Sequence, residues 1–241
     1  MNEEGELSFV MLATDYDATV ADDGVILPYT LKALLELKDS GWVMGLVTGR
    51  ELPDLLDACE PIDIFDLIVA ENGALLYLPR TKDVVELTSP PPGDFIIELS
   101  RRGIPFSAGD VIVATDDSYS QQVLSVIRDL DLELQIIFNK GSAMVLPVGV
   151  NKATGLKVGA SRMGLKMNQV VGVGDAENDH AFLEACGLSA AVANALDSIK
   201  ASASIVTSLP RGQGVAELIY EYLLNPACDL SRINRDPVAI E

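Results

Sequence analysis

Two aspartates, Asp15 and Asp17, follow an apolar run in the stretch FVMLATDYDATV, and two more, Asp175 and Asp179, stand in the stretch GDAEND. In an extended chain, side chains two residues apart point to the same side, so Asp15 and Asp17 are expected to face one site. Carboxylates gathered from two strand ends repel one another unless a cation lies between them. Oxygen ligands with room for water favour Mg²⁺ over zinc, so these residues first indicate magnesium binding.

Polar groups of a similar kind follow each of four apolar runs along the chain. In chain order they are Asp15 and Asp17; Thr48, Gly49 and Arg50; Glu71 and Asn72; and Asp175, Asn178 and Asp179. Each residue alone is a common helix cap or turn residue. In open α/β sheets, however, ligands bind outside the carboxyl ends of the strands. The four groups together therefore predict one binding site at that edge of a sheet.

Residue types argue against a calcium loop and a zinc site. An EF-hand loop that started at Asp15 would need Gly at its sixth position and Glu at its twelfth, where the chain has Val20 and Ile26. A loop that started at Asp175 would have His180 at the sixth position. His180 is the single histidine of the chain and supports no zinc site. The chain also lacks a G-x-x-x-x-G-K-[ST] loop, so ATP-driven P-loop chemistry has no support.

The elements that would position these residues alternate between strand and helix. Short apolar runs, each followed by a turn signal and a helical pattern, predict strands at residues 9–13, 42–47, 67–70 and 170–173. Further strands are expected at 188–192 and 204–207, and helices around 31–38, at 176–185 and at 215–224. This order predicts an α/β fold with a doubly wound parallel sheet.

Residues 81–147 differ in character and predict an inserted α+β unit. Their order is a proline-rich link (89–94), a helix (94–103), a strand (111–116), a helix (118–130) and two strands (132–138 and 143–147) around the turn NKGS. Successive strands with two amphipathic helices are typical of a largely antiparallel sheet with helices on one face. Residues 1–80 and 148–241 would form the α/β core.

Lys152, in the stretch GVNKATGL, begins a predicted helix that returns the chain from the insertion to the core. If that helix returns to the same edge of the sheet, its N-terminus points at the predicted site. Both the helix dipole and the lysine amine would then suit an anion.

Composition limits the partners and the setting. The net charge of −19 repels nucleic acid and anionic membranes. No apolar run reaches the roughly 18 residues of a membrane span, and the acidic opening MNEEGELSF does not resemble an export signal. Three separate cysteines form no C-x-x-C pair, so a reducing, cytoplasmic setting is expected. The sequence does not indicate an oligomeric state, and the tail from residue 225 is expected to be a loose end or a link to a further domain.

Taken in order, these motifs resemble those of the haloacid dehalogenase (HAD) superfamily of phosphohydrolases. DYDAT is similar to its motif I, VTGR to motif II, NKATGL to the motif III lysine and GDAEND to motif IV. The ENGA element and the place of the insertion resemble the branch with a C2-type cap, subfamily IIB, which includes Cof-type and sucrose-phosphatase-like enzymes. One departure is Ala18, because motif I usually has Gly there.

The resemblance implies a role for each residue of the predicted site. Asp15 would be the nucleophile that forms an aspartyl-phosphate, and Asp17 the general acid and base. Mg²⁺ would be held by the Asp15 carboxylate, the Asp17 main-chain carbonyl and Asp175, with Asp179 and Asn178 ordering the water ligands or that carboxylate. The residues expected to bind the phosphoryl group or the leaving group are Thr48, Gly49, Arg50, Asn72, Lys152 and Asn178, of which Thr48 and Lys152 also count as catalytic.

The sequence therefore predicts an Mg²⁺-dependent phosphatase acting on a small phosphorylated metabolite, either a sugar phosphate or an organic-acid phosphate such as phosphoglycolate. Two alternatives stay open: a sugar phosphomutase on the same scaffold, and a regulatory phospho-acceptor that does not turn over. The cap would close over the site and exclude water. Basic residues in or near the cap that could contact a substrate are Arg80, Lys82, Arg101, Arg102 and Lys140.

Overall fold

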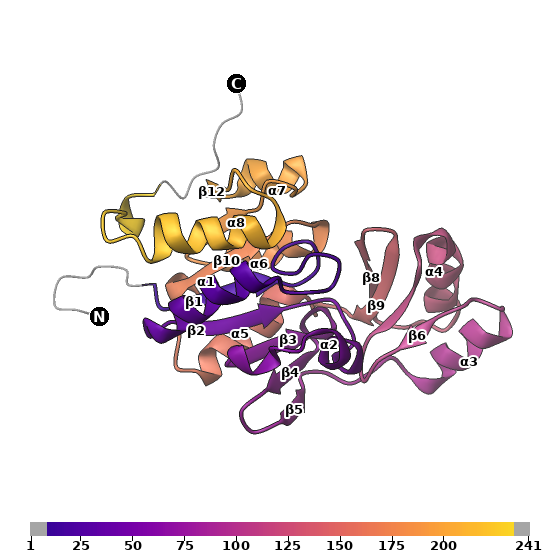
Figure 1. Cartoon of the computed structure of the whole chain (residues 1–241). Coiled ribbons are helices and arrows are strands. Elements are labelled where there is room, and N and C mark those ends of the chain that lie inside the picture. Colours follow the sequence, from indigo (N-terminus) through magenta and orange to yellow (C-terminus); the bar gives the residue numbers. More distant parts are fainter. Residues whose placement is uncertain (1–8, 234–241) are drawn as a thin grey trace.

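The computed structural model describes residues 9–233 of the chain. Its larger part is built on an eight-stranded sheet in the order β12-β11-β10-β1-β2-β3-β4-β5 (Figure 1). The strands from β12 to β3 run parallel, and β4 and β5 continue the sheet antiparallel. In chain order they are β1 (Met11–Asp15), β2 (Val43–Val47), β3 (Leu67–Ala70), β4 (Leu75–Leu78), β5 (Asp83–Glu86), β10 (Val170–Gly174), β11 (Leu188–Ala191) and β12 (Ile205–Val206).

Helices cover both faces of this sheet, which confirms the doubly wound α/β fold. α1 (Pro28–Asp39) packs against α8 (Arg211–Leu218), and α5 (Lys152–Arg162) packs against α6 (His180–Ala185). The chain moves outward from β1 to β3 and later, in the opposite direction, from β10 to β12. Because parallel crossovers are right-handed, this reversal places the second pair of helices on the other face. The shorter helices of this part are α2 (Leu52–Ala58) and α7 (Asp197–Ser202).

The central strands are buried on both faces, so their side chains are apolar on both sides. Met11, Leu12 and Ala13 of β1 have no exposed surface. The strand begins and ends later than the predicted residues 9–13, because Asp15 still pairs with Val47 of β2. Asp15 is therefore the last residue of a fully buried strand, at the carboxyl edge of the sheet.

Several predicted element bounds change. The predicted helix 176–185 is a 3₁₀ turn, Glu177–Asp179, followed by α6, and the last helix starts at Arg211 and continues as the π-helical segment Ile219–Leu223. The β4–β5 hairpin was not predicted, because β5 is a short edge strand whose exposed side chains give little apolar signal. The hairpin extends the core sheet past residue 80, so the predicted start of the insertion falls inside it.

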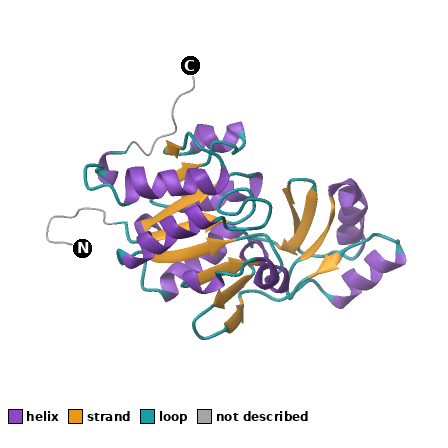
Figure 2. Cartoon of the chain, viewed as in Figure 1, coloured by secondary structure: helices purple, strands orange, loops and turns teal. Residues whose placement is uncertain are grey.

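The smaller part is the predicted α+β unit, here called the cap, which lies to one side of the sheet (Figure 2). Its four strands are antiparallel in the order β6-β7-β9-β8. Its elements are α3 (Gly93–Arg101), β6 (Ser107–Ala108), β7 (Val113–Asp116), α4 (Ser120–Asp129), β8 (Leu134–Asn139) and β9 (Ser142–Pro147). The two-residue strand β6 was not predicted, because it is too short to show alternation.

The two faces of the cap sheet have different partners. Val113 and Val145 pack with the apolar side chains of α3 and α4, which form a separate small core. Ala114 and Met144, which alternate with them along β7 and β9, pack instead against the main core. Since side chains alternate along a strand, one face of the cap sheet packs on its own helices and the other faces the core.

A buried carboxylate joins the cap to the core. Glu71, just after β3, has a positive φ of 50° and no exposed surface. Its carboxylate accepts N–H groups from Asp110 (2.9 Å), Val111 (2.7 Å) and Ile112 (2.8 Å), which lead into β7 of the cap. A Cβ on Gly109 would lie 2.4 Å from a Glu71 oxygen, so the cap backbone approaches this carboxylate too closely for a side chain. Burial raises the pKa of Glu71, although the three N–H groups oppose that change.

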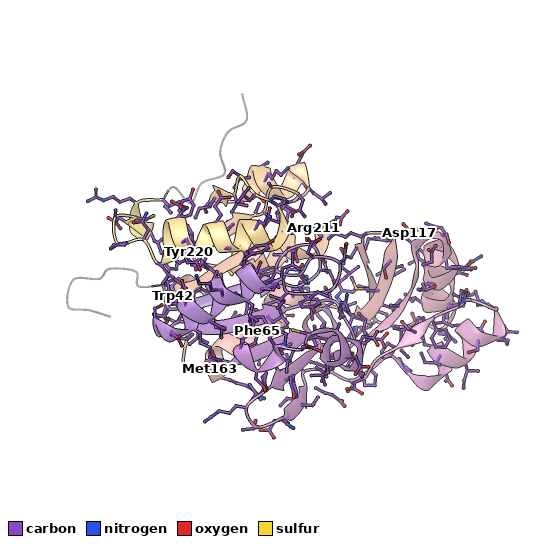
Figure 3. All side chains as sticks on the ribbon, viewed as in Figure 1. Trp42, Phe65, Asp117, Met163, Arg211 and Tyr220 are labelled. Carbon is purple, nitrogen blue, oxygen red and sulfur yellow. The ribbon has the colours of Figure 1, made fainter. Side chains whose placement is uncertain are left out.

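The C-terminal part is also tied to the loop after β1. The Arg211 guanidinium, at the start of α8, donates to the carboxylates of Asp22 and Asp23. Figure 3 labels Arg211 among all the side chains of the described residues. Leu230 and Ile233, in the predicted loose tail, pack against the main core. Residues 1–8, which hold most of the acidic opening, and residues 234–241 of the tail lie outside the described residues. Within residues 9–233, no helix is both long and apolar enough to cross a membrane.

Glu71→Gln is expected to loosen the cap. A glutamine amide keeps one acceptor oxygen but turns an NH₂ group toward backbone donors, so at least one buried N–H loses its partner. The free energy of unfolding in urea should fall by about 1–3 kcal/mol, and the amides of residues 110–112 should exchange faster with solvent. Glu86→Gln, on the exposed edge strand, is the matched control and should change stability by less than about 0.5 kcal/mol. Equal behaviour of the two variants would show that Glu71 does not hold the cap.

Candidate active site

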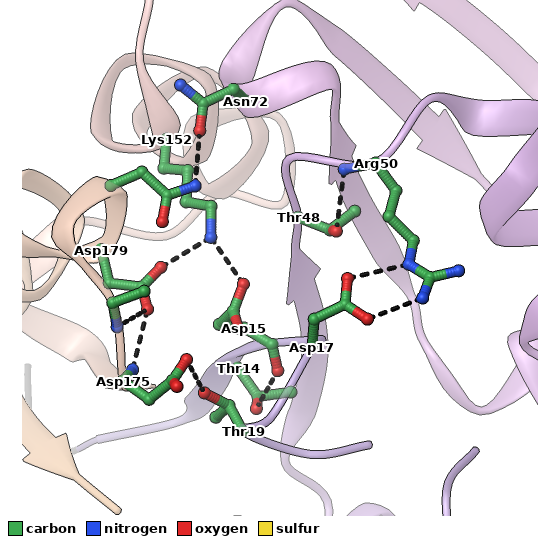
Figure 4. A network of polar contacts seen from close by, with 12 residues as sticks. Thr14, Asp15, Asp17, Thr19, Thr48, Arg50, Asn72, Lys152, Asp175 and Asp179 are labelled. Carbon is green, nitrogen blue, oxygen red and sulfur yellow. Dashed lines mark hydrogen bonds and ion pairs between the residues drawn. The ribbon is translucent and has the colours of Figure 1, made fainter. Parts of the chain in front are cut away.

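Four neighbouring strands, β10, β1, β2 and β3, bring the predicted polar groups to one edge of the sheet. Asp15 ends β1, Thr48 follows β2, Glu71 follows β3 and Asp175 follows β10. Because these strands are parallel and adjacent, their carboxyl ends meet at the same edge. Figure 4 shows how most of these side chains converge there.

Lys152 lies at the centre of this group. It is the first residue of α5, and its side chain is only 1% exposed. Its Nζ donates to Asp15 Oδ1 (2.5 Å) and to Asp179 Oδ1 (2.6 Å). The other oxygen of Asp179 accepts the N–H groups of Asp175 (2.8 Å) and Ala176 (2.9 Å). Asp179 therefore holds both the lysine and the loop after β10 in place.

Local sequence explains how α5 delivers this lysine. Asn151 caps the helix, and its side chain and that of Thr154 each bond to the other residue's backbone. Gly73 has a positive φ of 105°, and a Cβ there would lie 1.9 Å from the carbonyl oxygen of Asn151. Only glycine allows this close approach, so the turn after β3 and the start of α5 together place Lys152 beneath the site.

Burial is the main cause of the raised pKa values of the buried acids. It raises the pKa of Asp15 to about 7, with a further increase from the charge of Asp179, while Lys152 opposes both. Burial also raises the pKa of Asp175, against the effect of Lys140. For Lys152, burial lowers the pKa, but the charges of Asp15 and Asp179 outweigh it and raise the value above the ordinary one. The lysine is therefore a permanent cation.

Three of the buried acids could hold a metal ion. Asp15, Asp175 and Asp179 each offer an oxygen, and these oxygens lie within 4.8 Å of one another. All the donors are carboxylates, which suits a hard divalent cation. Asp179 is held by the buried Lys152 and by two backbone N–H groups, whereas one partner of Asp175 is the half-exposed Lys140, which a metal ion could displace. Asp15 and Asp175 are therefore better placed to be direct ligands. The main-chain carbonyl of Asp17 lies beside them, since one ammonium, that of Lys140, contacts it (3.2 Å) and Asp175 Oδ2 (2.8 Å).

The carboxylate of Asp17 is turned away from this cluster. It accepts two bonds from the Arg50 guanidinium, from Nε (2.8 Å) and Nη2 (2.7 Å), while Asp15 points to Lys152 (Figure 4). The backbone N–H of Arg50 donates to Thr48 Oγ1 (3.1 Å), and the guanidinium lies 5.1 Å from the ring centre of Tyr16. Arg50 thus fixes the direction in which Asp17 presents its carboxylate.

Asn72 and Asn178 form a buried pair with unused bonding capacity. Asn178 Nδ2 donates to Asn72 Oδ1 (3.0 Å), whereas Asn72 Nδ2 and Asn178 Oδ1 have no partner among the described residues. A Cβ on Gly49 would lie 3.5 Å from Asn178 Nδ2, so the pair lies beside the Gly49 backbone. A buried donor without a partner costs about 1–3 kcal/mol, which a bound anion would offset.

A cavity of about 230 Å³ lies between the core and the cap. The core side is lined by Asp15, Asp17, Gly49, Arg50, Glu51, Asp54, Ala176 and Asn178, and the cap side by Ile112, Ala114, Asn139, Lys140, Ser142 and Met144. Four residues of the predicted site do not line the cavity, but each bonds to a residue that does: Thr48 to Arg50, Lys152 to Asp15, Asp175 to Lys140 and Asp179 to Ala176. The cavity is smaller than a typical site for a drug-sized ligand, so it suits a small molecule.

Of the basic residues in or near the cap, only Lys140 lines this cavity. Arg101 and Arg102 pair with Glu98 on α3, and Arg80 and Lys82 are exposed on the β4–β5 hairpin. His180, which was expected to face solvent or to pack, has a side chain 49% exposed near Glu184 and no part in the acid cluster.

Sequence reasoning missed Asn194. This residue follows β11, and its Nδ2 donates to the carbonyl of Ala18 (2.9 Å) and to Asp175 Oδ2 (3.4 Å). Its Oδ1 accepts the N–H of Arg211 (2.7 Å). The rule that polar residues after parallel strands meet at one edge would have found it, had it been applied to the strand predicted at 188–192. Thr19, to which the sequence assigned no role, donates to Asp175 Oδ1 (3.1 Å).

Comparison with known proteins shows which family the chain belongs to. The family described as haloacid dehalogenase-like hydrolase matches residues 12–100 and 94–219, so the chain belongs to this family. A phosphoglycolate phosphatase of Methanothermobacter thermautotrophicus is 31% identical over 221 residues, which cover 88% of this chain and 98% of that protein. Phosphoglycolate phosphatase 2 of Saccharolobus solfataricus is 31% identical over 223 residues, which cover 89% of this chain and 92% of that protein. A crystal structure from Thermoplasma acidophilum has the same fold, with a TM-score of 0.77 at 18% identity over 89% of this chain and 98% of that one.

The departure from motif I at Ala18 lies at a strained position. Ala18 has a positive φ of 63°, a conformation that costs a residue with a side chain about 1–2 kcal/mol. Ala18→Gly is expected to leave stability unchanged or raise it by up to about 1 kcal/mol, because glycine loses more entropy on folding. Urea unfolding measures this. Ala201→Gly, inside α7, is the control and should lower stability by about 0.5–1 kcal/mol; a similar loss for Ala18→Gly would contradict the strain.

The raised pKa of Asp15 predicts a pH dependence of stability. With divalent cations removed by EDTA, the folded protein keeps a proton on Asp15 up to about pH 7, whereas the unfolded chain releases it near its ordinary pKa of 3.8. Stability from this group is therefore present at low pH and is lost as the pH rises from about 4 to about 7, by at most about 1.4 kcal/mol per pH unit. Urea unfolding of the wild type from about pH 5 to about pH 8 should show this slope.

Asp15→Asn should flatten the pH slope, because the variant has no carboxylate to titrate at this position. Asp83→Asn, on the exposed β5 strand, should keep it. An unchanged slope in Asp15→Asn would mean that Asp15 is ionised in the folded protein throughout this range.

Proposed function

We propose that this chain is an Mg²⁺-dependent phosphatase that hydrolyses a small phosphorylated metabolite through an aspartyl-phosphate on Asp15. The observation that carries the proposal is the setting of Asp15. The residue ends a buried strand, is itself 5% exposed and lines a cavity of about 230 Å³. Its carboxylate contacts Lys152 at 2.5 Å and has two further acids close by. Membership of a hydrolase family and phosphatase relatives along nearly the whole chain support the same reaction class.

In the first step, an Asp15 carboxylate oxygen attacks phosphorus, and the bond from phosphorus to the substrate oxygen breaks. Asp17 gives a proton to that leaving oxygen. In the second step, water attacks phosphorus, its proton passes to Asp17, and the bond to Asp15 breaks. The products are the dephosphorylated alcohol and inorganic phosphate. Splitting one difficult displacement into two steps lowers each barrier.

Arg50 supports this sequence by positioning Asp17. Its two bonds keep the Asp17 carboxylate on the cavity wall and apart from the acids around Lys152. The two aspartates therefore differ in their partners. Paired with Arg50, Asp17 is an ionised carboxylate that can take the proton of the attacking water, and it gives a proton to the leaving oxygen only after releasing Arg50. Lys152 orients Asp15 and neutralises part of the charge that gathers around it.

Asp15, Asp175 and the main-chain carbonyl of Asp17 would hold Mg²⁺, and Asp179 and Asn178 would order its surroundings. When bound, Mg²⁺ supplies positive charge that offsets the repulsion between the carboxylates and the phosphoryl group. The phosphoryl oxygens would accept hydrogen bonds from the Thr48 hydroxyl, the Gly49 amide, the Lys152 ammonium and Nδ2 of Asn72. The unpaired donor of Asn72 is the buried group that such an anion would satisfy.

The size of the cavity and the relatives favour a substrate of two or three carbons. The two reported relatives are named for phosphoglycolate, and phosphoglycolate would fit a cavity of about 230 Å³. The net charge of −19 argues against a nucleic-acid substrate. The three cysteines form no disulfide, which agrees with a cytoplasmic location.

Asp15→Asn is expected to lower phosphatase activity by on the order of 10³-fold or more, because the amide cannot form the aspartyl-phosphate. The measurement is release of inorganic phosphate from p-nitrophenyl phosphate and 2-phosphoglycolate with Mg²⁺. EDTA should abolish the wild-type activity, and added Mg²⁺ should restore it. Asp83→Asn should keep full activity.

Four results would argue against the proposal. Activity of Asp15→Asn near the wild-type level would exclude Asp15 as nucleophile, and full activity in EDTA would exclude a metal. Isomerised sugar phosphate without free phosphate would indicate a phosphomutase, and a stable phosphoprotein without turnover would indicate a phospho-acceptor.

A further inference from the structure

We propose that Lys140 is a specificity-determining residue, which pairs with a second anionic group of the substrate, a carboxylate, at the end away from the phosphoryl group. This inference rests on the proposed function. Lys140 lies at the tip of the cap, in the two-residue turn between β8 and β9. The turn has positive φ at Lys140 (46°) and Gly141 (85°), which is the geometry of a tight hairpin turn. A rigid hairpin thus presents this ammonium to the core.

The ammonium of Lys140 contacts oxygens that a metal ion would need. Nζ lies 2.8 Å from Asp175 Oδ2 and 3.2 Å from the main-chain carbonyl of Asp17. Those are two of the three oxygen groups assigned above to Mg²⁺. Two cations on the same oxygens repel each other, so the ammonium must leave them when a divalent ion binds. Its side chain is 42% exposed, which leaves it room to turn within the cavity.

The charges that line the cavity show what Lys140 would meet next. Only two of the lining residues are cations, Arg50 and Lys140, whereas Asp15, Asp17, Glu51 and Asp54 are acids. Arg50 is already engaged by Asp17 through two bonds. Once Mg²⁺ has displaced it from Asp175, Lys140 is the one cation lining the cavity that no acid of the protein would hold. It is therefore the cation that can bind a second anionic group of the ligand.

The rest of the cap wall favours a short substrate. Beside Lys140, the cap contributes three apolar side chains, Ile112, Ala114 and Met144, and two polar ones, Asn139 and Ser142. The hydroxyl of Ser142 makes only a long contact of 3.5 Å to the carbonyl of Thr115. One ammonium with a hydroxyl nearby can bind a carboxylate, but this wall offers few partners for the several hydroxyl groups of a sugar. The inferred substrate class is a small phosphorylated carboxylic acid.

The test compares two esters that differ only in the carboxylate. Values of kcat/KM with saturating Mg²⁺ are measured for 2-phosphoglycolate and for ethyl phosphate, in the wild type and in Lys140→Met, Lys140→Arg and Lys32→Met. Lys140→Met should lower kcat/KM for 2-phosphoglycolate by at least about 10-fold, mainly through KM, because a charge-assisted hydrogen bond is lost. Ethyl phosphate should change by less than about 3-fold. Lys140→Arg should keep most of the preference, and Lys32→Met, on exposed α1, should match the wild type.

A second measurement does not depend on turnover. Calorimetric titration with Mg²⁺ should show tighter binding to Lys140→Met than to the wild type, by about 3- to 10-fold, because no ammonium competes for Asp175. Lys32→Met should again match the wild type. Equal or weaker Mg²⁺ binding to Lys140→Met would overturn the argument from shared oxygens.

The kinetic outcomes distinguish a failure of the inference about Lys140 from a failure of the proposed phosphatase function. Equal losses with both esters in Lys140→Met would overturn the inference, since Lys140 would then act on the site as a whole, and the proposed phosphatase would stand. If Lys140→Met lowers kcat/KM for neither ester, the inference about Lys140 is overturned, and the proposed phosphatase again stands. A wild-type protein that hydrolyses neither ester, nor p-nitrophenyl phosphate, would contradict the proposed function and this inference with it.

Discussion

The mutual repulsion of Asp15, Asp175 and Asp179 is the constraint on which the rest of the site depends. Their oxygens lie within 4.8 Å of one another, and all three side chains are buried. Burial strengthens the repulsion, because little water screens it. Lys152, itself buried, offsets part of it by contacting two of the three acids at once. The arrangement is still short of positive charge, which is the condition under which a divalent cation binds.

The fold meets this constraint by bringing side chains together from distant parts of the chain. Asp15 comes from β1, Asp175 from the loop after β10 and Lys152 from the start of α5. None of these elements could hold a buried charge alone, since an unpaired one costs several kcal/mol. Glycines at positions 73 and 174 permit the close approach, because a Cβ at either would lie within 3 Å of a neighbouring atom. Charge balance at the site therefore depends on the packing of the whole core.

The sequence predicts those parts of the site that depend on local pattern, and misses those that depend on contacts between distant parts of the chain. Residues after parallel strands can be predicted, because the strand pattern is local and the sheet edge collects them. Asp15, Thr48, Asn72 and Asp175 were found in this way. The contact between Glu71 and the cap backbone could not be found, because it depends on how two units, each with its own apolar cluster, dock. The strands β5 and β6 were missed for a different reason: they are short and mostly exposed, so they pair through their backbones and have little side-chain pattern.

The docking of the cap also explains how an acidic protein could bind an acidic ligand. The net charge of −19 and the four acids that line the cavity both repel an anionic ligand. The cations near the cavity come from three separate places: Arg50 after β2, Lys152 at the start of α5, and Lys140 from the cap turn. Glu71 fixes the cap sheet from which that turn extends, by three bonds to its backbone. The positive charge is therefore complete only when the cap is docked, so recognition of an anion and exclusion of water depend on the same contact.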